Sequence, residues 1–345
     1  MRGKEEGRND TIDAFRGVAI LSVLTFHYLV RWAPPYEPQN VYGYSGRYPS
    51  ALAVGGLGVH LFFVISGLVI TMTVVGSKDA LDFAARRFAR LYPAFLVGMV
   101  LTAAVCASAD VWQFKIGLRD FFANLTMVPS DFKPPMKAAD VAYWSLAIEV
   151  KFYAYVAISY WWFRDLFWIA IAALAIFGNI GAFIGHGGFC DHWMIAEYMP
   201  LFLLGMGMWF FEFGSRPREG LLLIVLGAVL YAARHSVFQP VGAPPWMAHL
   251  YLAGTISSLF LLLLFKPSWT LGPLPWIGRI SYSLYLIHQN IGVIAIRELK
   301  RIGLPDIPAA LLATVGCIAF ATLMFNVIER PGKRLLMEAF HATGK

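Results

Sequence analysis

Residues 51–75 read ALAVGGLGVHLFFVISGLVITMTVV, a run without a single Lys, Arg, Asp or Glu. An α-helix of about 20 predominantly apolar residues crosses the hydrocarbon core of a bilayer. Segments of this character occur along the whole chain, at 13–31, 51–75, 92–108, 143–163, 166–185, 196–213, 221–235, 249–265, 281–297 and 307–328. The sequence therefore predicts an all-α polytopic membrane protein, a bundle of about ten transmembrane helices.

The overall composition excludes a soluble protein. Of the 345 residues, 58% are hydrophobic and 14% are charged, against about 25% charged residues in soluble domains. The formal net charge is +7, but the basic residues lie in short loops and form no continuous stripe. This excess favours an anionic lipid or an anionic ligand, and no nucleic-acid partner is expected.

Lysine and arginine in the short loops also predict the orientation, because they are enriched on the cytoplasmic side. More of them fall on the side of the N-terminus, although the longest outer loop, about 109–142, carries several of its own. Both termini are therefore expected in the cytoplasm. The expected division is a cytoplasmic N-terminal tail of residues 1–12, a transmembrane domain of 13–329 and a cytoplasmic C-terminal tail of 330–345.

Ionisable side chains inside the apolar segments are candidates for a functional site, because each costs about 2.5–3.5 kcal/mol to insert. They are Arg16, His27, His60, Glu149, Lys151 and His288. Arg16 and His27 are eleven residues apart, so they share a helical face and lie about 16 Å apart along its axis. A snorkelling arginine and a satisfied interior histidine explain each residue alone equally well.

Arginines gather after the second predicted span, in the stretch FAARRFARLYP of residues 83–93. Arg87 and Arg90 are spaced i and i+3, so they share a face if this stretch is helical, and Arg86 lies beside them. Planar guanidinium groups bind phosphate through paired donors. The patch is either a phosphate site or an ordinary cytoplasmic anchor, and by itself it favours the anchor.

The fourth predicted span carries a polar stripe, because Ser145, Glu149 and Tyr153 are spaced i, i+4 and i+8. A carboxylate such as Glu149 can hydrogen-bond a histidine, fix its tautomer and raise its basicity. An ion pair with Arg16 or Lys151 is the structural alternative.

The ninth segment carries Ser281, Tyr285 and His288 at i, i+4 and i+7. Helix packing through hydroxyl groups accounts for the serine but less well for His288. His60 follows a glycine-rich run that permits close helix approach, so packing is expected there. No metal is expected, because the histidines of the outer segment 186–192 match no standard zinc spacing.

Taken in order, these segments resemble the acyltransferase 3 family of membrane acyltransferases. The resemblance rests on DAFRGVAI and the following FH in 13–27, GVHLFFVISG of 58–67, RRFARLYP of 86–93, WSL, Glu149 and FY in 144–153, ISYSLYLIH of 280–288 and IERP of 328–331. These motifs occur in the family's order and cover the chain from about 13 to 334. His60 stands where many members have Asp, so no role is transferred to it.

The resemblance implies transfer of an acyl group from cytoplasmic acyl-CoA, with acetyl-CoA as the expected donor, to a hydroxyl of a saccharide or glycolipid. The family's arginine and histidine eleven residues apart match Arg16 and His27, and its paired arginines match Arg87 and Arg90. Arg87 and Arg90 are therefore expected to bind the CoA phosphates, and Arg16 the thioester or the pantetheine. A bacterial inner membrane is implied in the same way.

The chemistry of acyl transfer to a hydroxyl needs a base that removes the hydroxyl proton, and an unperturbed histidine titrates at about pH 6.5. His27 is therefore predicted to be the general base, with Glu149 as its orienting partner. Direct transfer and an acyl-histidine intermediate are both open. Candidate substrate-site residues are Ser145, Tyr153, Ser281, Tyr285 and His288.

Two other functions stay open. A transporter or flippase for a polar lipid or sugar also places charges and glycines inside helices, and a lipid-binding sensor would need no base. The acceptor, the acyl chain and the oligomeric state are not specified by the sequence. Aromatic residues that can stack on sugar rings or form an interfacial belt are Trp32, Tyr36, Tyr42, Tyr44 and Tyr48.

Overall fold

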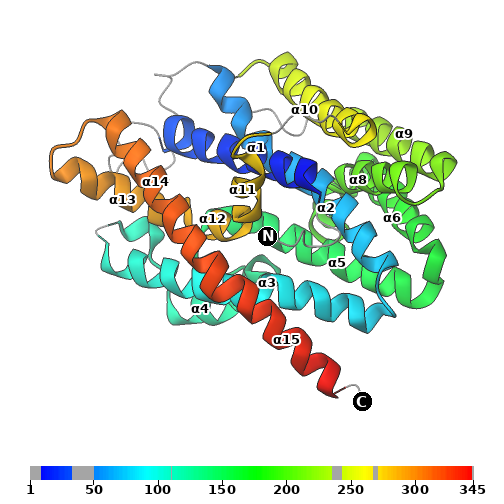
Figure 1. Cartoon of the computed structure of the whole chain (residues 1–345), viewed down its shortest axis with the longest axis horizontal. Coiled ribbons are helices and arrows are strands. Elements are labelled where there is room, and N and C mark those ends of the chain that lie inside the picture. The colour runs from blue at the N-terminus through cyan, green and yellow to red at the C-terminus, as the bar shows by residue number, and fades with distance from the viewer. Residues whose placement is uncertain (1–8, 33–49, 110, 235–242, 267–270, 344–345) are drawn as a thin grey trace, which may run out of the picture.

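The computed structural model describes residues 9–32, 50–109, 111–234, 243–266 and 271–343, which are helical without a strand (Figure 1). The α-helices are α1 Asp10–Phe26, α2 Gly58–Val75, α3 Ala80–Ser108, α4 Leu118–Asn124, α5 Trp144–Phe163, α6 Phe167–Gly181, α7 Gly187–Trp193, α8 Met199–Glu212, α9 Pro217–Ala233, α10 Pro245–Phe265, α11 Leu274–Arg279, α12 Ser281–Ile287, α13 Asn290–Arg301, α14 Asp306–Met324 and α15 Arg330–Thr343. Short 3₁₀ or π segments are η1 His27–Arg31, η3 Ser50–Leu57, η4 Trp112–Phe114, η5 Pro129–Asp131, η6 Val141–Tyr143, η7 Arg164–Leu166, η8 Ala182–His186 and η9 Phe325–Glu329. The predicted all-α fold is confirmed for these residues.

Within the described residues, six helical stretches are long and apolar enough to cross a membrane. They are Asp10–Arg31, Ala51–Val75, Ala80–Ser108, Val141–Trp193, Pro245–Phe265 and Asp306–Ala342. The stretch Val141–Trp193 holds both α5 and α6, which are separated at Arg164, where φ is 47°. Helix α8 is apolar but shorter. The count of ten spans and the cytoplasmic placement of both termini stay predictions.

Large apolar side chains cover the outside of the bundle. Phe183, Phe265 and Trp162 are 91%, 76% and 73% exposed, and many Leu, Val and Ile residues on the same helices are also exposed. A soluble monomer rarely carries apolar surface on this scale, whereas lipid solvates it. The helices and their exposed faces therefore support a multi-pass integral membrane protein.

Helix α2 lies in the centre, and 78% of its apolar stretch is buried. A Cβ atom at Gly67 of α2 would clash with the carbonyl oxygen of Phe202, and one at Gly205 of α8 would clash with that of Val64. Glycine therefore lets the backbones of α2 and α8 touch, as small residues do between membrane helices. The glycine-rich run before His60 packs against α1 in the same way.

Helix α3 begins well before the span predicted at 92–108. The side chain of Asp79 caps it by accepting a hydrogen bond from the amide of Asp82 at 2.8 Å. The arginines of residues 86–90 therefore lie on a helix and not in a loop. The prediction followed apolar residues alone, so it missed the charged first part of the helix, residues 80–91.

The predicted ninth span, 281–297, is broken into α12 and α13. Asn290 begins the second helix, where its backbone amide donates to Asp140 Oδ2 at 2.9 Å and its side chain donates to the carbonyl of Ala139 at 3.0 Å. Contacts from the loop before α5 thus fix the break. Apolar periodicity did not reveal it, because the partners are far away in the sequence.

Helices α14, η9 and α15 form one continuous rod that crosses α3 (Figure 1). At the crossing, Gly332 lies so close to Pro93 that an added Cβ would fall 2.6 Å from the Cβ of Pro93. Residues 330–343, predicted as part of a cytoplasmic tail, are therefore helical and packed. Residues 1–8 of the predicted N-terminal tail lie outside the described residues.

Candidate functional site

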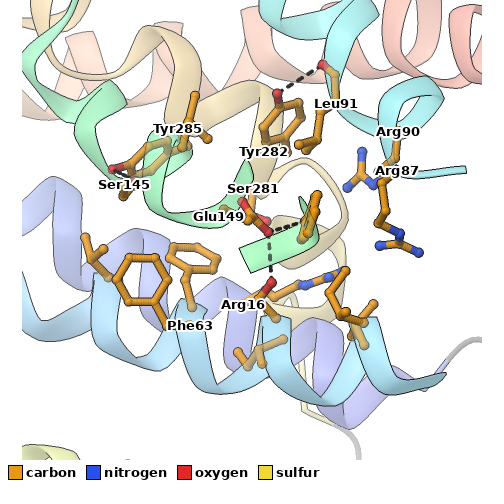
Figure 2. Close-up of a pocket in the computed structure, with 18 residues that line it drawn as sticks. Arg16, Phe63, Arg87, Arg90, Leu91, Ser145, Glu149, Ser281, Tyr282 and Tyr285 are labelled. Carbon is orange, nitrogen blue, oxygen red and sulfur yellow. Dashed lines mark hydrogen bonds between the residues drawn. The ribbon is translucent and has the colours of Figure 1, made fainter. Parts of the chain in front are cut away.

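A narrow cavity of about 90 Å³ lies inside the bundle, between α1, α2, α3, α5 and α12. Figure 2 shows Arg87 and Arg90 on one side of it and Ser145 on the other, with Arg16 and Glu149 between them. The structure thus brings together nearly all the polar residues predicted for the site. Those lining this one cavity are Arg16, Arg87, Arg90, Ser145, Glu149, Tyr153, Ser281 and Tyr285.

Glu149 is held in the middle of the narrow cavity by two hydroxyl groups. Its Oε1 accepts from Ser66 Oγ at 2.9 Å and from the hydroxyl of Tyr153. Arg16 lines the same cavity, so its guanidinium provides a counter-charge nearby. A carboxylate inside a membrane protein needs such partners, because removing an ionised group from water is costly.

Ser145 and Tyr285 close the far side of the narrow cavity. Their hydroxyl oxygens are 2.7 Å apart, and Tyr285 also donates to the carbonyl of Ala142 at 2.7 Å. The second donation assigns the phenolic proton to Ala142, so the serine hydroxyl donates to the tyrosine oxygen. The two predicted polar stripes, one on α5 and one on α12, therefore meet.

A wide cavity of about 910 Å³ opens beside the narrow one. Arg16, Val69, Arg87 and Arg90 line both cavities, so the two are adjacent at these residues. Seven Lys and Arg side chains and three carboxylates line the wide cavity among the described residues. The basic ones are Arg16, Arg86, Arg87, Arg90, Arg330, Lys333 and Arg334, and the acidic ones are Asp13, Glu329 and Glu338. This excess of positive charge suits an anionic ligand.

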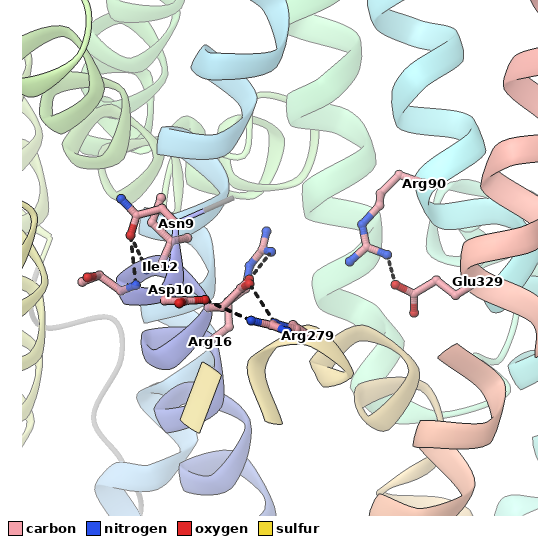
Figure 3. Close-up of polar contacts among 9 residues, drawn as sticks. Asn9, Asp10, Ile12, Arg16, Arg90, Arg279 and Glu329 are labelled. Carbon is pink, nitrogen blue, oxygen red and sulfur yellow. Dashed lines mark hydrogen bonds and ion pairs between the residues drawn. The ribbon is translucent and has the colours of Figure 1, made fainter. Parts of the chain in front are cut away.

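Two arginines of α3 use different partners at the junction of the cavities. Arg90 forms an ion pair with Glu329, which also accepts from Ser283 Oγ at 2.6 Å (Figure 3). Arg87 donates to the hydroxyl of Thr73, a neutral group. Arg87 therefore keeps its charge uncompensated by this partner, which favours binding of an anion there.

Asp13 joins α1 to α11 at the edge of the wide cavity. Its carboxylate lies 3.5 Å from Arg16 and 3.8 Å from Arg279, and Arg279 also donates to Asp10 at 3.0 Å (Figure 3). Gly278 fits against the backbone of Asp13, where a Cβ atom would clash. This cluster fixes the start of α1 and thereby the position of Arg16.

His27 and His288 lie side by side at a different level of the bundle. Their ring centroids are 5.1 Å apart. His288 is fully buried, and its Nδ1 lies 2.7 Å from the carbonyl oxygen of Tyr285. A carbonyl only accepts, so Nδ1 carries the proton and Nε2 presents a lone pair. The hydroxyl of Tyr28 donates to the carbonyl of His288 and holds the end of α12.

Several buried polar atoms at this level have no hydrogen-bond partner among the described residues. They are His27 Nδ1, His288 Nε2, Gln289 Oε1 and Nε2, and Asn290 Oδ1. An unsatisfied buried group costs about 1–3 kcal/mol, so such a cluster calls for a bound polar group. Water or a hydroxyl-bearing ligand is the chemistry that these donors and acceptors fit.

The predicted pairing of Glu149 with His27 is not seen in the described structure. Glu149 contacts Ser66 and Tyr153 and shares a cavity with Arg16, whereas the ring neighbour of His27 is His288. Arg16 and His27 are about 16 Å apart along α1, so Glu149 lies near the wrong end of that helix. The predicted pairing assumed that Glu149 and His27 lie at the same level of the bundle, and this arrangement does not support that assumption.

Lys151 and the polar residues Asp191 and His192 of the 186–192 segment make contacts of their own. Lys151 Nζ is 2.8 Å from Asp131 and His192 Nε2 is 3.1 Å from the same carboxylate. Asp191 pairs with Arg234 at 2.7 Å. In the part of the chain that the structure describes, no group of three or more His, Cys, Asp or Glu is placed to hold a metal ion. Tyr36, Tyr42, Tyr44 and Tyr48, predicted to stack or to anchor, lie outside the described residues, and Trp32 is buried.

Sequence analysis missed several partners in the site. Ser66, Thr73 and Ser283 are not among the residues predicted for the site, and Glu329 belongs to the IERP motif of 328–331 without a predicted role. Ser66 contacts Glu149, Thr73 contacts Arg87 and Glu329 contacts Arg90, in each case from another element. Ser283 in turn contacts Glu329. The only signal was the position of Glu329 at the end of an apolar run, where a charge needs a partner.

Comparison with known proteins shows similarity to membrane acyltransferases. A family model described as an acyltransferase domain matches residues 9–326. BcsY of Komagataeibacter xylinus, which carries the name of a membrane-bound transacylase, is 26% identical over 95% of this chain and 83% of its own length. The peptidoglycan O-acetyltransferase OatA of Listeria monocytogenes is 26% identical over 93% of this chain and 55% of its own length. The O-acetyltransferase OatA of Staphylococcus aureus is 24% identical over 95% and 58%.

The chain thus spans little more than half the length of the OatA relatives it matches. No solved structure matches it. The matched region nonetheless takes in α1 to α14, which carry both the narrow cavity and the pair of histidines. On the evidence of that match, this multi-pass chain belongs to the acyltransferase 3 family of membrane acyltransferases.

Proposed function

We propose that this protein is a membrane O-acyltransferase that moves an acyl group, acetyl in the first instance, from cytoplasmic acyl-CoA to a hydroxyl of a saccharide or glycolipid. The names of the OatA relatives support acetyl transfer and, for the Listeria protein, a saccharide polymer as acceptor. A bacterial inner membrane is the matching location. His27 is the proposed general base.

The observation that carries the proposal is a series of polar groups that leads from a basic surface cavity to the pair of half-buried His27 and buried His288. The wide cavity adjoins the narrow one at Arg16, Arg87 and Arg90. The narrow cavity reaches Tyr285, whose ring centroid is 5.2 Å from that of His288. His288 in turn lies beside His27. Such a series suits a donor with phosphates at one end and a reactive group at the other.

CoA has this shape, because its phosphates are separated from the thioester by the long, mostly neutral pantetheine arm. In the proposal, Arg87 and Arg90 bind the phosphates through bidentate, charge-assisted hydrogen bonds. The arm then passes Arg16, Glu149 and Tyr153 toward the histidines. The axial separation of about 16 Å between the levels of Arg16 and His27 is the distance that the arm has to span.

The narrow cavity, at about 90 Å³, is smaller than the roughly 300–1,000 Å³ of ordinary ligand sites. The arm can therefore pass only if side chains turn aside. Tyr153 and Ser66 both donate hydrogen bonds to Glu149, so these three side chains form the proposed constriction. Glu149 is then a positioning residue of the passage, and this role replaces the orienting role toward His27.

The proposed reaction is an ordinary acyl transfer. The imidazole of His27 takes the proton of the acceptor hydroxyl as the oxygen attacks the thioester carbonyl carbon. The C–O bond forms, the C–S bond breaks, and the proton passes from His27 to the departing CoA thiolate. Neutral imidazole is required at the start. His27 Nδ1 and His288 Nε2 have no hydrogen-bond partner among the described residues, which suits a hydroxyl and a proton.

The test measures thiol release from acetyl-CoA by purified protein in nanodiscs, with and without a panel of glycans. We expect acceptor-dependent release that is lost in His27→Ala and kept in His186→Ala, because His186 is an exposed histidine on η8. Release that survives in a folded His27→Ala variant would refute His27 as the base and as an acyl carrier. Failure of the wild-type protein to bind CoA would refute the enzyme.

A transporter or flippase is the competing proposal, and the break between α12 and α13 is the observation in its favour. Discontinuous helices line transport sites, but they typically occur as a pair in corresponding halves of the fold. The test that separates the two is covalent: a transporter moves a labelled glycolipid across vesicles unchanged, whereas an acyltransferase adds the mass of the acyl group.

A further inference from the structure

Helix α15 lies beyond the region that the family model matches, yet it forms one wall of the wide cavity. Arg330, Lys333 and Arg334 line this cavity from α15. Their spacing of i, i+3 and i+4 places them on one face of the helix. Helix α3 contributes Arg86, Arg87 and Arg90 to the same cavity. Two basic helix faces, from segments far apart in the sequence, therefore flank one cavity.

The two walls differ in their distance from the interior. Arg87 and Arg90 line both the wide and the narrow cavity, whereas the basic residues of α15 line only the wide one. A bound ligand that extends from the wide into the narrow cavity therefore contacts α3 nearer its inner end and α15 at its outer end. The order along the ligand is fixed by this arrangement.

We propose that the basic face of α15 binds the 3′-phosphate of the adenosine end of CoA, while Arg87 and Arg90 bind the diphosphate. The inference rests on the proposed function, and it assigns a donor-binding role to a helix that the family model does not cover. Of the phosphate groups of CoA, the 3′-phosphate lies at the end away from the thioester, which matches the outer place of α15.

The charges at the cavity agree with this division. Each carboxylate of the wide cavity faces an arginine: Glu329 faces Arg90, Asp13 faces Arg16, and Glu338 faces Arg334 at 2.7 Å. Cations still exceed carboxylates by four among the lining residues that are described. A 3′-phosphate carries nearly two negative charges at neutral pH and accepts several hydrogen bonds.

The position of α15 is fixed well enough to present this face. Gly332 packs against Pro93 of α3, so the α15 residues are held beside the arginines of α3. The ion pair of Arg90 with Glu329 joins the same two elements (Figure 3). Lys333 and Arg334 themselves are exposed on the helix, so replacing them leaves the packing intact.

The experiment compares two soluble probes, CoA and dephospho-CoA, which lacks only the 3′-phosphate. Binding is measured by calorimetry with the full chain in nanodiscs of zwitterionic lipid. We expect the wild-type protein to prefer CoA about tenfold or more. The double variant Lys333→Gln, Arg334→Gln should weaken CoA binding but not dephospho-CoA binding, so that the preference disappears.

Two matched variants complete the design. Arg87→Gln should weaken the binding of both probes and keep their ratio, because the diphosphate is common to both. Arg218→Gln removes an exposed arginine of α9 and should change neither affinity. A preference for CoA that persists in the α15 double variant overturns the proposal. So does a double variant that alters binding only when anionic lipid is present, because α15 then binds a lipid phosphate.

The failure of the proposed function gives a different result. Wild-type protein that binds neither probe refutes the acyl-CoA donor altogether. Wild-type protein that binds both probes equally refutes only the assignment of α15.

Discussion

The two ends of the proposed site satisfy their polar groups in opposite ways. At the wide cavity the carboxylates Asp13, Glu329 and Glu338 are each paired with an arginine. At the level of His27 and His288, buried ring nitrogens have no partner among the described residues. At the wide cavity every described lining carboxylate has an arginine partner, and the remaining charge is positive. At the histidines the groups are neutral, and some of their nitrogens have no partner in the described part of the chain.

This difference follows from where each end lies. Ion pairs near a membrane surface gain from partial hydration, and phosphate binding needs fixed positive charge. Deeper in the bundle a charge is costly, so groups that can work while neutral are favoured there. Histidine is such a group, because its neutral form is the base. Here His27 Nδ1 and His288 Nε2 contact no polar group of the described chain, so they can accept a hydrogen bond from a hydroxyl or donate one to it.

The largest difference between the two ends is expected when one group is removed from each. We expect His27→Gln to lower the turnover of acyl transfer by about 10²–10⁴-fold, the usual range for a general base, while CoA binding persists. Arg87→Gln should instead lower CoA affinity with a smaller effect on turnover at saturating donor. Steady-state kinetics together with calorimetry measures both.

If His27→Gln and Arg87→Gln lowered CoA affinity and turnover in the same proportion, the two ends would not have the separate roles proposed for them. His186→Ala serves as the histidine control, because this residue is exposed on η8.

The second prediction concerns stability at the charged end. Glu329 is 3% exposed and pairs with Arg90, which is partly exposed. Glu329→Gln leaves Arg90 without its carboxylate and weakens the contact with Ser283. Breaking a buried pair from one side costs about 3–5 kcal/mol, and partial exposure of the arginine reduces this to about 2–3 kcal/mol. Thermal unfolding in nanodiscs should show a clearly lower midpoint.

The double variant Arg90→Met, Glu329→Met provides the control, because it removes both charges together. It should recover most of the lost stability. An equally low midpoint in the double variant would mean that packing, and not charge pairing, holds α3 to η9.

The sequence was enough to predict the helical membrane fold and most members of the site. Arg16 and Glu149 were predicted because ionisable groups are costly in apolar segments, and Tyr153 because of its helical spacing from Glu149. Arg87 and Arg90 were predicted from the family resemblance. The structure places all five around one cavity. The helical spacing of Ser145 and Tyr285 with their neighbours also predicted inward-facing stripes, which meet in the structure.

The level of each side chain in the bundle and its hydrogen-bond or ion-pair partners could not be predicted from the sequence. Glu149 was placed at the level of His27, because span boundaries fix depth only to within several residues. Helix α3 was predicted to start at 92 and α13 to continue α12, because Asp79 and Asp140 act through hydrogen bonds that apolar patterning does not contain. The pairing of Arg90 with Glu329 joins residues 239 positions apart, beyond any local pattern.

A third prediction concerns the pH dependence of stability at Asp140, which holds the start of α13 close to His288. Asp140 lies outside the apolar spans and accepts from the amides of Asn290 and Ala142. Burial raises the pKa of its carboxyl from its ordinary value to about 6. The folded protein therefore keeps a proton that the unfolded chain loses at lower pH, and the stability gained from this proton is lost as pH rises through about 6.

Asp140→Asn cannot ionise, so its unfolding midpoint relative to wild type should increase between pH 5 and pH 7. Measuring both proteins at each pH cancels the titration of all other groups. A constant difference between the two midpoints would show that Asp140 titrates normally and that its hydrogen bonds outweigh its burial.

The smallest effect is expected at the outermost ion pair of the charged end, between Arg334 and Glu338 on α15. Their side chains are 81% and 58% exposed, and exposed i, i+4 pairs contribute only about 0.3–0.5 kcal/mol. Glu338→Gln should therefore leave the unfolding midpoint nearly unchanged, in contrast to Glu329→Gln. Removing this carboxylate also takes away a negative charge from the cavity wall, so CoA affinity should rise slightly. A loss of stability similar to that of Glu329→Gln would mean that α15 depends on its own surface pairs and is not held by its packing on α3.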